Sequence, residues 1–159
     1  MKASALFPML AGLFITACYN PQHVVSDEMK PLSSKGWHWN EVQTVQTKLE
    51  DTAIQYNMVL KLRITGGYRY ANLYLLFHVK DPSGKTETRQ YNFNLQDKNG
   101  RWYGKGSGEL MSFEIPVNAS LRAAKPGVYQ IGIQQNMRDE TLQHVTDIGL
   151  RIEKGKAVY

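Results

Sequence analysis

The chain contains one cysteine, Cys18, and it stands at the end of an N-terminal apolar run. Lys2 precedes that run of small and apolar residues. A positive start followed by a short apolar stretch is typical of an export signal. Pro8 interrupts the run, which is shorter than the roughly 20 residues that a helix needs to cross a bilayer core. We therefore expect a signal peptide over residues 1–17, and a permanent membrane span is the weaker alternative.

The thiol of Cys18 could carry a lipid. Ile15-Thr16-Ala17-Cys18 resembles a bacterial lipobox, in which small residues admit a processing enzyme and the cysteine takes up a diacylglyceryl group. Cleavage before Cys18 would leave a lipidated amino terminus. Each buried methylene contributes about 0.8 kcal/mol, so two or three acyl chains anchor a protein stably. An ordinary signal peptide with a chance cysteine is the alternative.

The residues after the cysteine bear on localisation. Tyr19 stands where the enterobacterial rule for inner-membrane retention has an aspartate, and no acidic cluster of the kind associated with surface export in Bacteroidetes follows it. Both features favour a cell-envelope protein that is lipid-anchored in the outer membrane and faces the periplasm.

Length and charge describe one domain with a mildly basic surface. The 159 residues, 42% of them hydrophobic, are sufficient for a single core. The 19 Lys and Arg against 14 Asp and Glu give a net charge of +5, and the basic residues are scattered along the chain. Scattered charge is typical of a solvated surface, so no nucleic-acid partner is expected.

The mature chain divides into a tether and an all-β domain. Residues 18–36 are mostly polar or turn-forming and lack periodicity, which predicts a lipidated N-terminus and flexible tether. Apolar residues alternate with polar ones over 54–65 and again over 72–80, as in strands with one buried face. Together with similar segments up to 152, they predict an antiparallel β-sandwich of roughly seven or eight strands over 37–159.

Turn-forming residues separate the predicted strands. Asp81-Pro82-Ser83-Gly84 favours a turn, and the Asn-Gly pair in Asp97-Lys98-Asn99-Gly100 suits a tight hairpin. The latter segment shares Asp-x-Asn-Gly with calcium loops but lacks their downstream glutamate. Residues 118–125 are predicted to form one helical turn that ends at Pro126-Gly127.

The sequence predicts no enzyme, metal site or cofactor. The four histidines lack close metal-ligand spacing with one another or with an acid. Ser107 lies in Gly104-Lys105-Gly106-Ser107-Gly108, which is not a nucleophile elbow. Pairs of acids such as Glu109 and Glu114 could be imagined in a glycosidase, but solvated acids are the commoner case.

Aromatic residues near the turns are the candidate binding residues. Exposed rings beside an arginine could stack on a sugar or hold a protein partner. The alternative is that the rings cover the second face of the sandwich core. The candidates are Tyr68, Tyr70, Tyr74, Trp102 and Tyr103.

Asp51-Thr52-Ala53 marks a candidate modification site. It resembles the Asp-Ser/Thr-aliphatic sequon for O-glycosylation in Bacteroidetes and falls in a predicted loop. Intact mass from the native host tests glycosylation of Thr52. An unmodified mass, or one unchanged by Thr52→Ala apart from the substitution itself, would reject it.

Several stretches together resemble the gliding-motility lipoprotein family GldH of Bacteroidetes. They are residues 70–77 (YANLYLLF), 95–108 (LQDKNGRWYGKGSG), 135–138 (QNMR) and 147–153 (DIGLRIE). Arg69 stands where the family pattern has a proline. The resemblance implies a cell-envelope lipoprotein associated with gliding and with the linked surface-protein export machinery, and it carries over no catalytic residue.

The expected function is therefore a non-enzymatic accessory protein. Lipid at Cys18 fixes the chain to the membrane, and a β-sandwich presents loops or a strand edge to envelope proteins of the gliding or secretion machinery. The alternative is a glycan-binding periplasmic or surface lipoprotein whose tyrosines and Trp102 stack on sugar rings.

We expect Cys18→Ala to abolish incorporation of radiolabelled palmitate in the native host, because the substitution removes the sulfur that carries the diacylglyceryl group. The same variant is expected to leave the membrane fraction. Retention of residues 1–17 on the native product, without lipid mass, would contradict the prediction.

Overall fold

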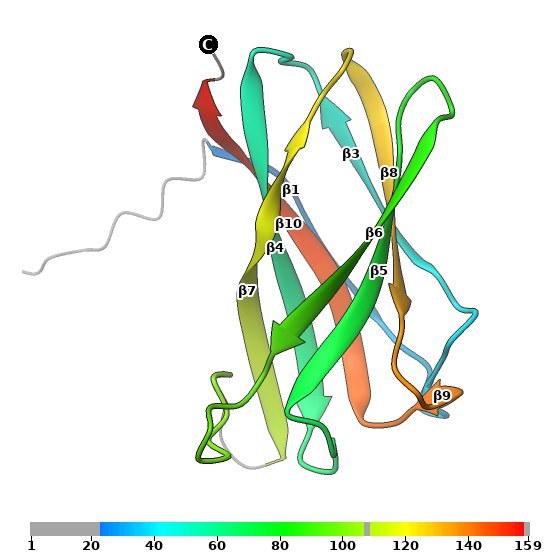
Figure 1. Cartoon of the computed structure of the whole chain (residues 1–159), viewed down its shortest axis with the longest axis vertical. Helices are drawn as coiled ribbons and strands as arrows, with labels where there is room; N and C mark the ends of the chain where they lie inside the picture. The colour runs from blue at the N-terminus through cyan, green and yellow to red at the C-terminus, as the bar shows by residue number, and fades with distance from the viewer. Residues whose placement is uncertain (1–22, 107–108, 158–159) are drawn as a thin grey trace, which may run out of the picture.

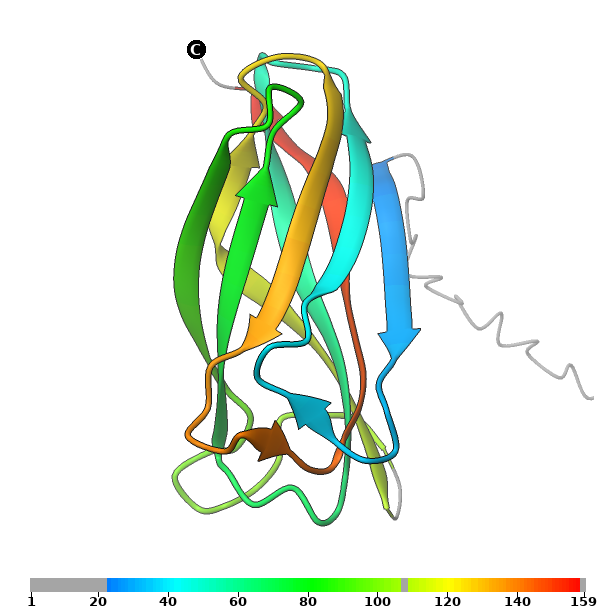
Figure 2. The ribbon, with the colours of Figure 1, turned by 90° about the vertical axis from the view of Figure 1, so that its right-hand side faces the viewer.

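The computed structural model describes residues 23–106 and 109–157; Cys18 and the predicted signal peptide lie outside them. Two four-stranded antiparallel sheets face each other, in the orders β1-β10-β4-β7 and β3-β8-β5-β6, and β2 pairs with β9 in a small third sheet (Figures 1 and 2). The strands are β1 (Val24–Pro31), β2 (Trp37–His38), β3 (Gln43–Leu49), β4 (Ile54–Thr65), β5 (Asn72–Lys80), β6 (Thr86–Asn94), β7 (Leu110–Arg122), β8 (Gly127–Gln135), β9 (Thr141–Leu142) and β10 (Val145–Ala157). The predicted antiparallel sandwich is confirmed.

The apolar rows that alternate in the sequence form the core. β4 and β10 are paired over most of their length and present their inward rows to those of β5 and β8. Burying these rows removes them from water, which is the dominant favourable term in folding. The inward residues of β4, β5 and β10 are Tyr56, Met58, Leu60, Leu62, Ile64, Leu73, Leu75, Phe77, Ile148, Leu150 and Ile152.

The sandwich begins earlier than predicted. β1 occupies Val24–Pro31, a segment that the sequence analysis assigned to the tether, and it pairs antiparallel with β10 from Val24 to Pro31. Most of its residues are half-buried on both faces, so its sequence shows no apolar alternation. β1 also approaches β3, where the Ser26 hydroxyl donates to the Thr47 hydroxyl at 3.0 Å.

The predicted helical turn at 118–125 is wrong. β7 continues as a strand to Arg122, and its last residues pair with the first residues of β4. Asn118 and Ser120 favour helix starts locally, but pairing with the neighbouring strand prevails over that preference. Pro116 is tolerated because β7 is an edge strand.

The predicted turns are confirmed. The amide of Gly84 donates to the Asp81 carbonyl at 2.9 Å, and the amide of Gly100 donates to the Asp97 carbonyl at 3.0 Å. Both glycines have positive φ, at 89° and 78°.

Among the described residues, no helix is long and apolar enough to cross a membrane.

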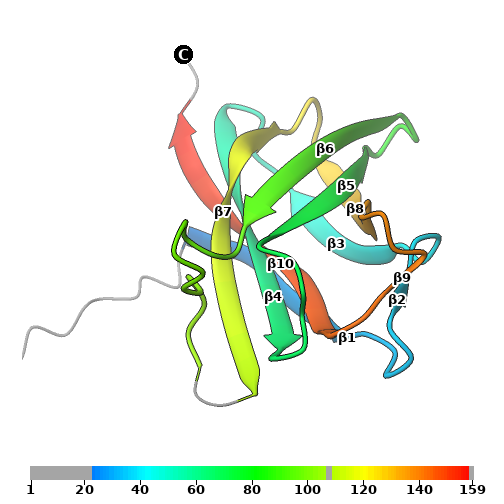
Figure 3. The same ribbon diagram turned by 60° about the horizontal axis from the view of Figure 1, so that its bottom comes forward.

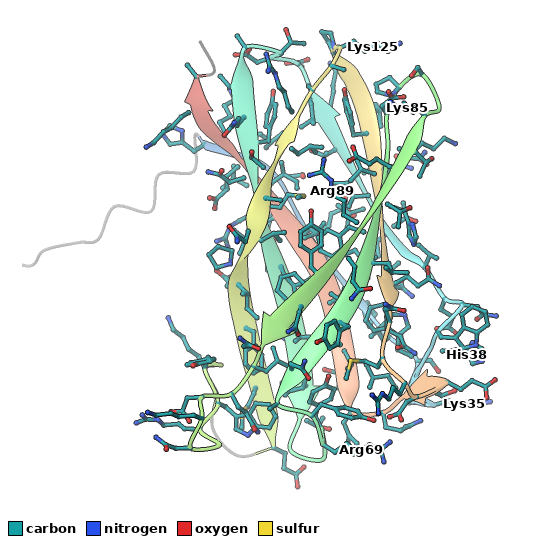
Figure 4. The ribbon with its side chains drawn as sticks, in the orientation of Figure 1. Lys35, His38, Arg69, Lys85, Arg89 and Lys125 are labelled. Carbon is teal, nitrogen blue, oxygen red and sulfur yellow. The ribbon has the colours of Figure 1, made fainter. Side chains whose placement is uncertain are left out.

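The antiparallel strands give the sandwich two distinct ends. At the amino end, β1 starts and β10 finishes, beside the loops at residues 50–53, 81–85 and 123–126 (Figure 1). At the far end lie the loops at 66–71, 95–106 and 136–144. Lys85 and Lys125 lie at the amino end, and Lys35, His38 and Arg69 lie toward the far end (Figure 4).

We expect Gly149→Ala to lower the free energy of unfolding by about 1–3 kcal/mol, as overpacking typically does. A Cβ at Gly149 would lie 2.0 Å from the Glu28 carbonyl oxygen and 2.7 Å from the Met29 Cα, so β1 has to move away from β10. Denaturant unfolding and amide exchange of residues 24–31 measure the effect.

Gly66→Ala is the matched control, because a Cβ built there has no heavy atom within 4 Å outside Gly66 and its two neighbours in the chain. Equal stability and equal β1 exchange in the two variants would contradict the close approach at Gly149.

Candidate binding groove

An open groove of about 510 Å³ lies on the outer face of β5 and β6 near the far end of the sandwich. Figure 3 turns this end forward and shows the loop that leads from β8 to β9. The groove is lined by Tyr70, Asn72, Tyr74, Gln90, Asn136, Met137 and Arg138. Its volume is within the range of small-ligand sites.

The two β5 residues that line the groove, Asn72 and Tyr74, lie on the same face of the strand. Leu73 and Leu75 point into the core, so Asn72 and Tyr74 point outward. Across the ladder, Asn72 faces Asn94, Tyr74 faces Asn92 and Leu76 faces Gln90. These three pairs give this part of the outer face of the hairpin a surface without charged side chains.

A buried amide holds the loop that forms the other wall. Gln135 is 2% exposed at the end of β8. Its Nε2 donates to the Asp139 carbonyl at 2.9 Å, and its Oε1 accepts the Met137 amide at 2.8 Å. Because a buried amide is costly without partners, these bonds fix the conformation of residues 136–139 against the sheet.

The loop is also tied to β5. The Asn136 amide donates to the Tyr74 carbonyl at 2.9 Å, and the Tyr74 amide lies 3.2 Å from the Met137 sulfur, which accepts from it. The chain segments at 70–77 and 135–138, which carry part of the family resemblance, therefore meet in one groove.

A second cavity, of about 420 Å³, shares the lining residue Tyr70 with the groove. On its wall, the Arg69 guanidinium donates to the Tyr70 hydroxyl at 3.0 Å and to Asp139 Oδ1 at 2.6 Å. These two contacts raise the pKa of Arg69. They hold Tyr70 and the loop at Asp139 in fixed relative positions.

Tyr68 supports the groove from inside the protein. Its ring packs 5.9 Å from that of Tyr70, and its hydroxyl donates to the Asn72 carbonyl at 2.9 Å. Burial, with smaller contributions from Tyr70 and Asp139, raises the pKa of Tyr68 well above its ordinary value. Tyr68 is therefore a neutral donor throughout the physiological pH range.

The structure separates the five aromatic candidates. Tyr70 and Tyr74 line the groove, whereas Tyr103 is 63% exposed on a different loop. Tyr68 is 4% exposed, so its ring belongs to the core, as the alternative interpretation has it. Trp102 is half-buried, 6.2 Å from the Phe113 ring, so it packs on the core as the alternative interpretation proposed.

Three of the described histidines, His38, His78 and His144, make hydrogen bonds that tie strands and loops together. His38 contacts Glu140 at 3.3 Å, His78 lies between Thr88 and Gln134, and the ring of His144 is 2.8 Å from the Thr65 hydroxyl. Within residues 23–106 and 109–157, no three metal-ligating side chains cluster.

Thr52 is exposed in the loop between β3 and β4, at the amino end. The preceding Asp51 is held there because its Oδ1 accepts the Ala53 amide at 2.8 Å. The site is accessible to a modifying enzyme, and glycosylation of Thr52 stays a prediction. Cys18 lies outside the described residues, so its lipidation also stays a prediction.

Five groove residues were not among the binding residues predicted from the sequence, namely Asn72, Gln90, Asn136, Met137 and Arg138. The outward position of Asn72 was readable from the alternation of β5. The approach of residues 136–138 was not, because it depends on which strands are neighbours.

The fold and the groove define a class of protein: a two-sheet β-sandwich with a structured groove near one end. A sequence model of the GldH lipoprotein family matches residues 24–152, so the chain belongs to that family.

Two relatives agree with this assignment. The gliding motility lipoprotein GldH homolog of Christiangramia forsetii is 29% identical over 125 residues, covering 74% of this chain and 77% of that protein. The gliding motility lipoprotein GldH of Flavobacterium johnsoniae is 27% identical over 153 residues, covering 92% and 93%. A solved structure of infectious bursal disease virus matches at 13% identity, and the match covers 97% of this chain and 46% of the viral chain. Its TM-score of 0.22 is too low to indicate a shared fold.

We expect Gln135→Leu to destabilise the protein by about 1–3 kcal/mol, because it leaves the Met137 amide and the Asp139 carbonyl without their partner. Amide exchange of residues 136–140 should accelerate more than that of β4. Gln46→Leu on the exposed face of β3 is the control. If the two variants have the same stability and loop exchange, Gln135 does not hold the loop.

Proposed function

We propose that this chain is a non-enzymatic, lipid-anchored accessory protein of gliding motility and the linked surface-protein export machinery. It is anchored in the outer membrane through Cys18 and faces the periplasm. The names of its relatives support a lipoprotein role in gliding motility. The far end of the sandwich presents the surface that binds envelope proteins.

The observation that carries this proposal is the position of β1. Val24 starts β1 at the amino end, where it pairs with Glu153 near the end of β10. Six residue steps separate Cys18 from Val24, which span at most about 20 Å when fully extended. The amino end is thus kept close to the bilayer surface. The 12 residues of β4 extend about 40 Å along the sandwich, so the far end stands away from the membrane.

Exposed apolar residues at the far end supply the contact surface. Trp39 is 51% exposed after β2, and its amide is fixed by the Glu140 carbonyl at 2.9 Å. Tyr103 and Leu110 are 63% and 44% exposed around the loop that precedes β7. Aromatic residues that are held in place and exposed are typical anchors of protein interfaces.

The contacts of the polar side chains around the groove support a binding role over a catalytic one. Asp139 is paired with Arg69, and Glu140 lies beside His38. Gln135 uses both the nitrogen and the oxygen of its side-chain amide to hold the loop. The interactions that these side chains make serve to position the surface.

We expect Trp39→Ala to lower the yield of the crosslink between the full chain and an envelope protein in the native host at least tenfold. The reason is that the substitution removes an anchor residue of the interface. Photocrosslinking from a residue at the far end, followed by mass spectrometry, measures the yield. Val128→Ala is the matched control, because Val128 is 50% exposed at the amino end.

An unchanged yield with Trp39→Ala, or an equal loss with Val128→Ala, would contradict the proposed contact surface. Protease shaving of intact cells tests the facing. Digestion of the domain without opening the outer membrane would contradict a periplasmic position.

A further inference from the structure

We propose that the groove between Tyr70, Tyr74 and the loop at 136–138 binds an uncharged oligosaccharide. In this site the tyrosine rings contact the apolar faces of the sugars, and Asn72, Gln90 and Asn136 bond their hydroxyls. The proposal goes beyond the accessory role, since it concerns residues other than Trp39, Tyr103 and Leu110.

The first support is the chemistry of the lining. Three of the described lining residues carry amides, two carry phenol rings, and no carboxylate is among them. An amide both donates and accepts, which matches a sugar hydroxyl that does the same. Aromatic rings with polar edges provide apolar contact area beside those amides.

The second support is that the amides are already oriented. Asn72 Nδ2 donates to Asn92 Oδ1 at 2.9 Å, and Asn136 Nδ2 donates to Gln90 Oε1 at 3.0 Å. Each bond occupies one group of each amide. Asn72 Oδ1 and Asn136 Oδ1 remain as acceptors, and Gln90 Nε2 remains as a donor, within the part of the chain that the structure describes. Because the side chains are already ordered, the entropic cost of ordering them on ligand binding is small.

The third support is the fixed position of the rings and the loop. Arg69 holds Tyr70 through its hydroxyl, and Tyr68 packs edge-on against the same ring. A backbone hydrogen bond joins the Asn136 amide to the Tyr74 carbonyl. Two segments more than 60 residues apart thus form one preformed wall, as ligand sites usually do.

The lining carries too few cations for a polyanionic ligand. Arg138 is the one cation among the described residues that line the groove. Arg69, at its margin, is paired with Asp139 at 2.6 Å. Since polyanion sites use clusters of arginine or lysine, the groove favours a neutral oligosaccharide over one that carries an acid on every sugar.

Tyr70 and Tyr74 both line the groove, so a chain of sugars with one ring against each tyrosine fits this arrangement better than a single sugar.

The test uses the purified full chain in detergent and four probes: cellotriose, maltotriose, triacetylchitotriose and trigalacturonate. Isothermal titration and amide chemical shifts measure binding. We expect at least one neutral trisaccharide to bind with millimolar or better affinity and to shift the amides of residues 70–74 and 135–138. Trigalacturonate is expected to bind more weakly.

Variants assign the site. Tyr74→Ala and Asn136→Ala should each weaken binding roughly tenfold. Tyr74→Phe, which keeps the ring, should retain most of it. Tyr103→Ala is the control for an exposed tyrosine elsewhere, and unchanged dispersion of the spectrum shows that each variant is folded.

Three results would overturn the proposal: no binding of any neutral trisaccharide at 10 mM, tighter binding of trigalacturonate, or binding that Tyr74→Ala and Asn136→Ala leave unchanged. Displacement of a bound trisaccharide by the crosslinked protein partner would also overturn it, since the groove would then be a protein site. The crosslinking yield of Trp39→Ala is a separate readout, so the two proposals can fail independently.

Discussion

The antiparallel pairing of β1 with β10 is the contact on which the arrangement of the molecule depends. Met29 lies opposite Gly149, and the missing side chain at Gly149 lets the two backbones approach. This pairing brings the start of the folded chain to the amino end, where β10 also finishes. Because Cys18 is only six residues before Val24, the same pairing determines which end of the sandwich the proposed lipid anchor holds.

The apolar faces of the two sheets explain why the far end can carry irregular loops. The inward rows of β4, β5, β8 and β10 form one continuous core. The loops at the far end add structure of their own through specific bonds. Gln135 is the clearest case, since its single amide fixes both the Met137 amide and the Asp139 carbonyl. The groove therefore depends on the hydrogen bonds of Gln135, which lies at the edge of the apolar core.

The sequence was informative where one face of a strand is fully buried. The alternation of β4 is legible because its inward residues lie in the core and most of its outward residues meet solvent. β1 was missed because an edge strand that is half-buried on both faces has no such alternation. The end of β7 was assigned to a helix because local capping preferences at Asn118 and Ser120 do not reveal the pairing with β4.

The candidate site shows the same division. Tyr70 and Tyr74 were found from residue type and position, and β5 could be predicted to turn Tyr74 outward. The partnership of these tyrosines with Asn136 and Met137 depends on β8 being the neighbour of β5, which alternation alone does not specify. Tyr68 is buried, as the alternative interpretation of the aromatic residues has it, and its hydroxyl is satisfied by the Asn72 carbonyl inside the protein.

The proposed roles use the two ends differently. A short link at the amino end fits a protein that keeps a fixed distance from the bilayer, and the far end holds both the exposed aromatic residues and the groove. A glycan and a protein partner could then be held side by side near the far end, about one sandwich length from the membrane.

The distance of each end from the bilayer is the most direct test of this account. Lys85→Cys at the amino end and Lys98→Cys at the far end place a fluorophore on exposed loops. Cys18 is the one natural cysteine, and its sulfur is occupied in the lipidated protein that we propose. In vesicles with acceptor-labelled headgroups, energy transfer should be strong from position 85 and weak from position 98. Equal transfer from both positions, or stronger transfer from position 98, would contradict the account.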